Sequence, residues 1–150
     1  MPFKLNISEK NGKTWKVEST DEFFVGKTIG ERVHGKEISN DLDGYELQIA
    51  GASDNAGFAH KKDVDGSELK RVLLTKGWGM WKKPRKLGKK IVSTPHGLRL
   101  RKTVRGNRLS EKTVQINLLV IKAGHKHLKD MFPDQNKPKE KAPEVVAPVA

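Results

Sequence analysis

The stretch KTVQINLLVIKAG, residues 112–124, is the longest apolar run of the chain and decides the reading of its fold. Apolar and polar residues alternate along it, which is the pattern of a β-strand with one buried face. Gln115 and Asn117 fall on the more polar face. The residues expected on the buried face are Val114, Ile116, Leu118 and Val120. A long strand in a β-sheet is therefore predicted here.

Other segments of the first hundred residues show the same alternation. Two alternating runs joined by the turn EKNG predict a β-hairpin over residues 3–19. Tyr45, Leu47 and Ile49 predict another half-buried strand, and KRVLLTKG (70–77) predicts a more fully buried one. Short strands separated by glycine turns are typical of a small closed or nearly closed barrel. The predicted fold class is mainly β, a small β-barrel with a basic, loop-rich extension and a flexible C-terminal tail.

Two further segments complete the predicted domain. In DEFFVGKTIGERVHGKEI (21–38), Phe23, Phe24 and Ile29 are expected to cover one end of the sheet, with a short helical turn. The last stretch is rich in Pro, Ala, Lys and Glu and has no periodicity, which predicts a flexible tail. A length of 150 residues fits one domain. The prediction is a single domain over residues 1–130 and a tail over residues 131–150.

The composition excludes several classes of protein. There is no cysteine, which rules out disulfides, cysteine-ligated zinc and thiol catalysis, and agrees with a reducing compartment. No stretch approaches the roughly 20 apolar residues of a membrane helix, and the N-terminus alternates rather than forming the apolar run of a signal peptide. A cytosolic protein that does not bind a membrane is expected.

The positive charge is concentrated in one segment. The formal net charge is +12. Residues 69–110 hold 14 Lys or Arg and no acid, whereas the rest of the chain holds 16 basic and 18 acidic residues. Evenly scattered charge would indicate general solubility, and an acid-free block instead indicates a polyanionic partner. The alternative is a solvated charged face.

Nucleic acid is the partner that best matches this basic segment. Lysine supplies point charge, arginine a planar fork for phosphate or a guanine edge, and glycine a close backbone approach. Trp78 and Trp81 favour RNA, because indoles stack on unpaired bases, although either could instead pack on the barrel. The residues predicted to bind RNA are Lys70, Arg71, Lys76, Trp81, Lys82, Lys83, Arg85, Lys86, Lys89, Lys90, Arg99, Arg101, Lys102, Arg105 and Arg108.

Catalytic and metal chemistry finds little support in the sequence. Asp54, in the glycine-rich stretch 49–60, has no partner carboxylate at a useful spacing, so a turn held by its side chain is the expected role. His125 and His127 have no third ligand of the usual kind nearby. No catalytic triad and no phosphate-binding loop are present. We expect no enzyme, cofactor, metal or small-molecule substrate.

Several motifs, in their spacing, closely resemble a known family. They are VRGNRLSEKTVQINLLVIKAG (104–124), DVDGSELKRVLLTKG (63–77), IAGASDNAGF (49–58) and VGKTIGERVHG (25–35). They resemble the archaeal and eukaryotic e-type family of small-subunit ribosomal protein six, over roughly residues 3–130. The resemblance implies a β-barrel on the solvent side of the small subunit, with basic extensions that enter ribosomal RNA. It also implies neighbouring ribosomal proteins as partners.

The resemblance also implies particular RNA contacts. In GLRLRKTVRGN these are Arg99, Arg101, Lys102, Arg105 and Gly106, and in TKGWGMWKKPRK they are Lys76, Lys82, Lys83 and Arg85. In this sequence Ala52 replaces a glycine of the family turn, and Ala59 and His60 stand where the family has Pro-Met. Contacts of Lys89 and Lys90 rest on charge alone, because GKKIVSTPHGL is longer than the family norm.

The C-terminal region departs from the eukaryotic members. Those members carry a long basic helix with phosphorylated serines, whereas here Thr113 is the only hydroxyl residue from Glu111 onward. The kinase-regulated switch is therefore not carried over, and the chain is archaeal in type.

The sequence predicts a structural constituent of the small ribosomal subunit that binds ribosomal RNA through residues 69–110. Two other interpretations are a nucleic-acid-binding regulatory barrel outside the ribosome and an enzyme that acts on RNA through Asp54 or His60.

Overall fold

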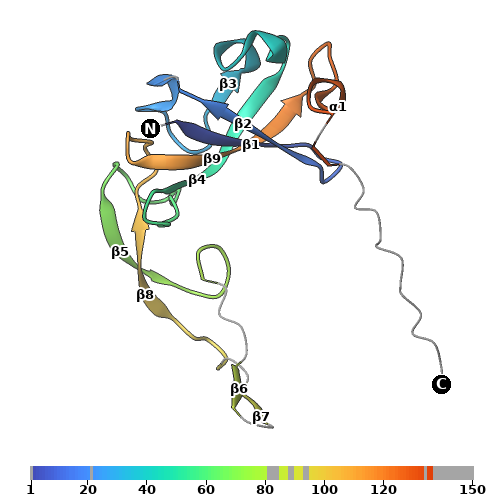
Figure 1. Cartoon of the computed structure of the whole chain (residues 1–150). Helices are drawn as coiled ribbons and strands as arrows, with labels where there is room; N and C mark the ends of the chain where they lie inside the picture. The colour runs from blue at the N-terminus through green and yellow to red at the C-terminus, as the bar shows by residue number, and fades with distance from the viewer. Residues whose placement is uncertain are drawn as a thin grey trace, which may run out of the picture.

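The computed structural model is built around one mixed five-stranded sheet, in the order β2-β1-β9-β4-β3 (Figure 1). The strands are β1 (Phe3–Ser8), β2 (Thr14–Ser19), β3 (Arg32–His34), β4 (Glu46–Asp54) and β9 (Thr113–Lys122). The hairpin predicted over residues 3–19 is confirmed, and β1 also pairs in parallel with β9. The residues described by the structure are 2–20, 22–80, 85–87, 90–92, 95–133 and 135–136.

Strand β9 is the centre of this sheet, as its alternating sequence predicts. Ile116, Leu118 and Val120 are buried on one face. Val114 was expected beside them but is only half-buried. The pairing with β4 shifts between Ser53 and Asp54, which leaves one extra residue on β9 and turns Val114 off the buried face. That part of the strand prediction is wrong because a bulge interrupts the alternation.

The prediction of a closed barrel is also wrong for the described residues, because β2 and β3 lie at opposite ends of an open sheet. At each edge of the sheet, a local feature accounts for the absence of a further paired strand among the described residues. Strand β3 has three residues and runs directly into the 3₁₀ turn η2 (Gly35–Glu37). Next to β2, the side-chain amide of Gln135 donates to Lys16 O at 2.9 Å and accepts from Lys16 N at 2.7 Å. A side chain therefore occupies backbone groups that a further strand would have used.

The main core lies against the five-stranded sheet. As expected, the segment between β2 and β4 covers one end of it: η1 (Glu22–Phe24) buries Phe24 completely, and Ile29 is buried nearby. Phe24 meets Phe3 edge to face, with 6.0 Å between ring centroids. The short turn η3 (Asn40–Leu42) and helix α1 (Leu128–Met131) add Leu42 and Leu128 to the same cluster.

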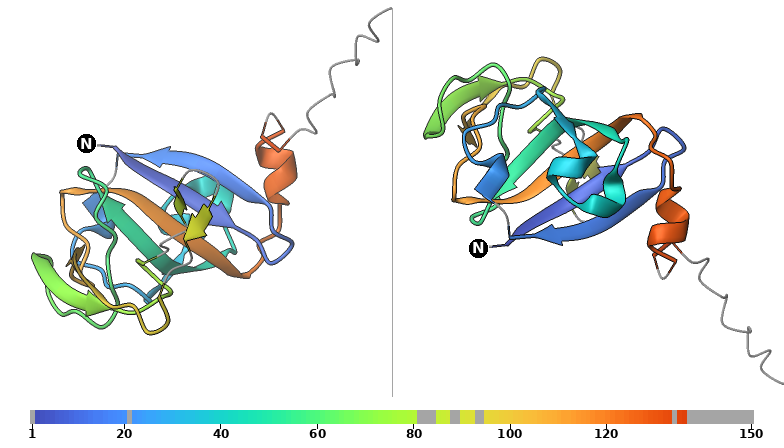
Figure 2. Two further views of the ribbon diagram at one scale, coloured as in Figure 1. Left: turned by 90° about the horizontal axis from the view of Figure 1, so that it is seen from below. Right: turned by 90° about the horizontal axis from the view of Figure 1, so that it is seen from above.

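A two-stranded antiparallel ribbon, β5 (Leu69–Leu74) with β8 (Leu100–Arg105), projects from this globule (Figures 1 and 2). One side of it holds a second, smaller core of Val64, Leu74, Met80 and Val104. The sequence predicted a more fully buried strand over residues 70–77. That prediction is wrong: Leu73 is 55% exposed, and Lys70 and Arg71 are exposed as well, because the ribbon has packing on one side only.

The remaining described elements are short. Strands β6 (Arg85–Leu87) and β7 (Lys90–Val92) form a second antiparallel ribbon. The predicted tail begins on the globule, since Met131 and Phe132 pack against the main core and Gln135 contacts β2. Residues 137–150 lie outside the described part. Within the described residues no helix has the length and apolar character needed to cross a membrane.

Candidate nucleic-acid interface

The ribbon and its flanks carry most of the described cations that the sequence assigned to RNA. Strand β5 carries Lys70 and Arg71 next to its apolar residues, and β8 supplies the antiparallel partner. Their basic side chains are exposed on both sides of the ribbon: Arg71 and Arg101 on the side away from the small core, Lys70 and Lys102 on the side that carries it. The exposed basic residues of this region are Lys70, Arg71, Lys76, Arg99, Arg101, Lys102 and Arg108.

These exposed cations have no carboxylate partner among the described residues. Four of the five described ion pairs involve Lys27, Lys61, Lys122 and Lys126, all outside residues 69–110. Within the segment, Lys70 Nζ donates to Asp65 O at 2.8 Å and Lys102 Nζ donates to Gly79 O at 2.9 Å. Both partners are neutral carbonyls, so these ammonium groups keep their net charge. The arrangement can attract and neutralise a polyanion.

Arg105 is placed differently from the other predicted contacts. Its side chain is 8% exposed and that of Asp54 is 1% exposed. Arg105 Nε and Nη2 lie 3.0 and 2.9 Å from Asp54 Oδ2, and Nη1 donates to Ser67 O at 2.8 Å. All three guanidinium nitrogens are thus engaged inside the protein. We therefore leave Arg105 out of the interface and assign it to the joint between ribbon and sheet.

Asp54 also holds the tight turn that the sequence predicts at its position. Its Oδ1 accepts a hydrogen bond from Phe58 N at 2.8 Å, and Gly57 N donates to Asp54 O at 3.0 Å. One carboxylate therefore closes the turn after β4 and anchors Arg105 of β8. Sequence reasoning found the turn but missed the ion pair, since the two residues lie 51 positions apart.

His60 lies in the same joint and is completely buried. Its Nδ1 is 2.7 Å from Gly106 O, and its Nε2 is 3.2 Å from Thr113 Oγ1. Burial lowers the pKa of His60, and the nearby Arg105 charge acts in the same direction, partly opposed by the Gly106 carbonyl and by Asp54. The imidazole is therefore neutral near pH 7, with Nδ1–H donating to Gly106 and Nε2 accepting from Thr113.

Gly106 follows Arg105 and was predicted to let the backbone approach RNA. In the structure it is buried, and a Cβ built there would lie 2.0 Å from Gly66 O. Neighbouring backbone bonds hold the same contact, since Gly106 N donates to Glu68 O and Arg108 N to Gly66 O, each at 3.0 Å. The close approach that this glycine permits is to the protein's own loop.

Several predicted contacts are not described at the level of side chains. Trp81, Lys82, Lys83 and Lys89 lie outside the described residues. Arg85, Lys86 and Lys90 lie on β6 and β7, whose backbone pairing is described. Trp78 is 46% exposed, and Lys61 Nζ lies 5.5 Å from its ring centroid. A partly exposed indole beside a cation remains available for stacking on a base.

Comparison with known proteins decides the family. The sequence model of the family described as Ribosomal protein S6e matches residues 3–133. The chain belongs to this family. It is 39% identical over 123 residues to small ribosomal subunit protein eS6 of Methanocaldococcus jannaschii, covering 82% of this chain and 84% of that protein. It is 40% identical over 135 residues to eS6 of Methanothermobacter thermautotrophicus, covering 88% and 96%. The resemblance read from the sequence motifs is confirmed.

This chain departs from the usual S6e sequence pattern around the turn after β4, at Ala52 and at Ala59-His60. Ala52 is buried, and His60, which stands at the family's Pro-Met position, fills a buried site with its ring. His60 N also donates to Ala52 O at 2.9 Å. These departures therefore lie on the inside of the joint. Asp54 and His60, the residues weighed for catalysis, both have their polar atoms engaged in internal contacts.

Proposed function

We propose that this S6e-family protein binds ribosomal RNA through the basic segment 69–110 as a structural constituent of the small ribosomal subunit. Family membership places it in the small subunit of the cytoplasmic ribosome. The observation that carries the RNA-binding part is the group of exposed cations on and around the β5–β8 ribbon, which have no carboxylate partner among the described residues.

The proposed mechanism is electrostatic. The sheet and its core form a base, and the basic side chains neutralise phosphates and release their counterions. No catalytic step is proposed. Arg105 is excluded because its charge is matched internally, and Arg71 and Arg101 share a face with leucines. The residues proposed to contact RNA are Lys70, Lys76, Lys82, Lys83, Arg85, Lys86, Lys89, Lys90, Arg99, Lys102 and Arg108, with Trp81 stacking on a base.

The proposal is tested by a charge reversal on exposed residues of the ribbon and its flanks. The variant Lys76→Glu/Arg99→Glu/Lys102→Glu removes three exposed cations. If each contacts one phosphate, the slope of log K against log salt should decrease by about 2 to 3, at 0.7 to 0.9 per phosphate. The melting temperature should change little, because surface substitutions are usually within about 0.5 kcal/mol.

A charge-matched control is available in the same chain. Lys10, Lys13 and Lys36 are exposed and lie outside the basic segment, so their reversal to Glu should leave the salt slope nearly unchanged. Equal loss in both variants would mean that only net charge matters, and the proposed interface would be wrong. Sedimentation of lysates in moderate salt separates a ribosomal constituent from a free regulatory protein, since only the former migrates with small subunits.

A further inference from the structure

The ribbon has two chemically different faces. Cross-strand pairing places Leu69, Arg71 and Leu73 of β5 opposite Arg105, Thr103 and Arg101 of β8. The alternate residues Val72, Leu74, Leu100 and Val104 point the other way and pack in the small core. We call the first set, without the buried Arg105, the outer face: Leu69, Arg71, Leu73, Arg101 and Thr103. The residues that form the ribbon's packed layer all belong to the opposite face.

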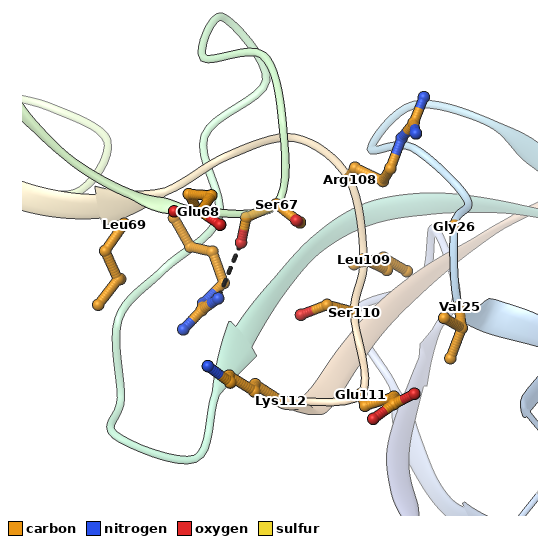
Figure 3. Close-up of a pocket in the computed structure, with 11 residues that line it drawn as sticks. Val25, Gly26, Ser67, Glu68, Leu69, Arg108, Leu109, Ser110, Glu111 and Lys112 are labelled. Atoms are coloured by element: carbon orange, nitrogen blue, oxygen red, sulfur yellow. Dashed lines mark hydrogen bonds between the residues drawn. The ribbon is translucent and has the colours of Figure 1, made fainter.

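The outer face is unusually apolar for an exposed surface. Four large hydrophobic residues of the described chain are exposed; Leu69 (45%) and Leu73 (55%) lie on this face, and Val25 (38%) lines a pocket together with Leu69. Val25 and Leu69 stand on opposite sides of a pocket of about 520 Å³ between ribbon and sheet, with Leu109 also lining it (Figure 3). A cluster of exposed apolar groups beside a pocket marks an interaction site, whereas single exposed leucines do not.

The charges at this surface favour a protein over RNA. The exposed cations of the outer face are Arg71 and Arg101, whereas the opposite face carries Lys70 and Lys102. Arginine is enriched and lysine depleted where proteins meet, because the guanidinium is weakly hydrated. The pocket itself has a mixed lining, since Glu68 and Glu111 stand with Arg105, Arg108 and Lys112, so it is not a uniformly basic phosphate site. The exposed leucine side chains form no favourable interaction with a charged phosphate group.

We propose that the outer face and its pocket dock an extended, acidic and apolar segment of a neighbouring protein in the small subunit. One apolar side chain of that segment fits between Val25 and Leu69, and its acidic side chains pair with Arg71 and Arg101. Ser110 lines the same pocket, and its buried hydroxyl has no hydrogen-bond partner in the described part of the chain. That hydroxyl bonds the backbone of the docked segment.

Site-specific photocrosslinking in assembled small subunits tests this inference. A benzophenone amino acid replaces Leu73 on the outer face, and in a matched chain it replaces Lys70 on the opposite face. Ribonuclease and protease sensitivity distinguish RNA adducts from protein adducts. We expect Leu73 to crosslink to a protein peptide containing apolar and acidic residues, and Lys70 to crosslink to RNA. The added change Val25→Asp should lower the Leu73 protein adduct at least fivefold while leaving the Lys70 adduct unchanged.

Every other result at Leu73 overturns the inference. An RNA adduct means that the outer face belongs to the RNA interface, absence of an adduct means that it faces solvent, and a basic peptide means that the charge argument is wrong. The Lys70 probe reports separately on the proposed RNA interface, so failure of one proposal is distinguishable from failure of the other. Thermal melting of the full chain checks that Val25→Asp remains folded, which its exposure predicts.

Discussion

The buried pair between Arg105 and Asp54 gives the most decisive prediction about this protein, because sequence reasoning assigned Arg105 to RNA. The substitution Arg105→Met keeps the apolar stem but removes the guanidinium that binds Asp54 and Ser67. The carboxylate of Asp54, 1% exposed, is then left without its counterion. Breaking such a buried pair costs about 3–5 kcal/mol. At about 2–4 °C per kcal/mol for a chain of this size, the melting temperature should fall by roughly 6–20 °C.

Urea and thermal unfolding followed by circular dichroism measure this loss. Arg99→Ala is the matched control, since Arg99 is exposed just before β8 and should cost no more than about 0.5 kcal/mol. The double variant Arg105→Met/Asp54→Asn should recover a large part of the stability, because the unpaired charge is gone while the amide oxygen can still accept from Phe58 N.

RNA binding should rank the two variants in the opposite order to stability. Arg99→Ala should reduce the slope of log K against log salt by the amount that corresponds to about one phosphate contact. Folded Arg105→Met should leave this slope unchanged. If Arg105→Met melts like the unmodified chain and lowers the salt slope as Arg99→Ala does, then Arg105 is a phosphate contact, and the reasoning from its burial is refuted.

Two further predictions concern the same joint. Gly106→Ala should be strongly destabilising in urea titrations, because its Cβ would lie 2.0 Å from Gly66 O, whereas Gly51→Ala, with no atom within 4 Å, should be nearly neutral; equal effects would contradict the close contact. The lowered pKa of His60 means that the unfolded chain binds a proton that the folded chain excludes. Stability should therefore be complete above about pH 6.5 and fall below it, by at most about 1.4 kcal/mol per pH unit from this group. His60→Asn should flatten this dependence, and an unchanged slope would mean that His60 is not its source.

The parts of the fold that the sequence predicted are those set by local alternation. The hairpin over residues 3–19 and the strand at Tyr45 were predicted because alternate residues must face one core. Barrel closure failed because it depends on what meets the sheet edges, and here Gln135 reaches β2 from 119 residues away. The position of Val114 failed because a bulge can be recognised only from the pairing partner.

The candidate site shows the same division. The acid-free block could be found by counting charges, and most of its described cations are exposed. Counting could not separate Arg105 from Arg101, which lie four residues apart on one strand and share a face. The difference arises from the position of Asp54, which the chain brings to one end of the ribbon and not to the other. The strand predicted over residues 70–77 is present as part of β5, but its expected burial failed, because the small core packs on only one face of the ribbon.

The joint also explains how a two-stranded ribbon can hold its cations in fixed positions. Isolated two-stranded ribbons are marginally stable, so this one depends on its small core and on its attachment to the sheet. Arg105 ties β8 to the turn after β4, and His60 ties the following residue, Gly106, to Thr113 at the start of β9. A phosphate contact gains affinity when its side chain stands on a pre-positioned backbone, because less freedom is lost on binding. Arg105 would thus support RNA binding without touching RNA, by holding the backbone from which Lys102 and its neighbours reach outward.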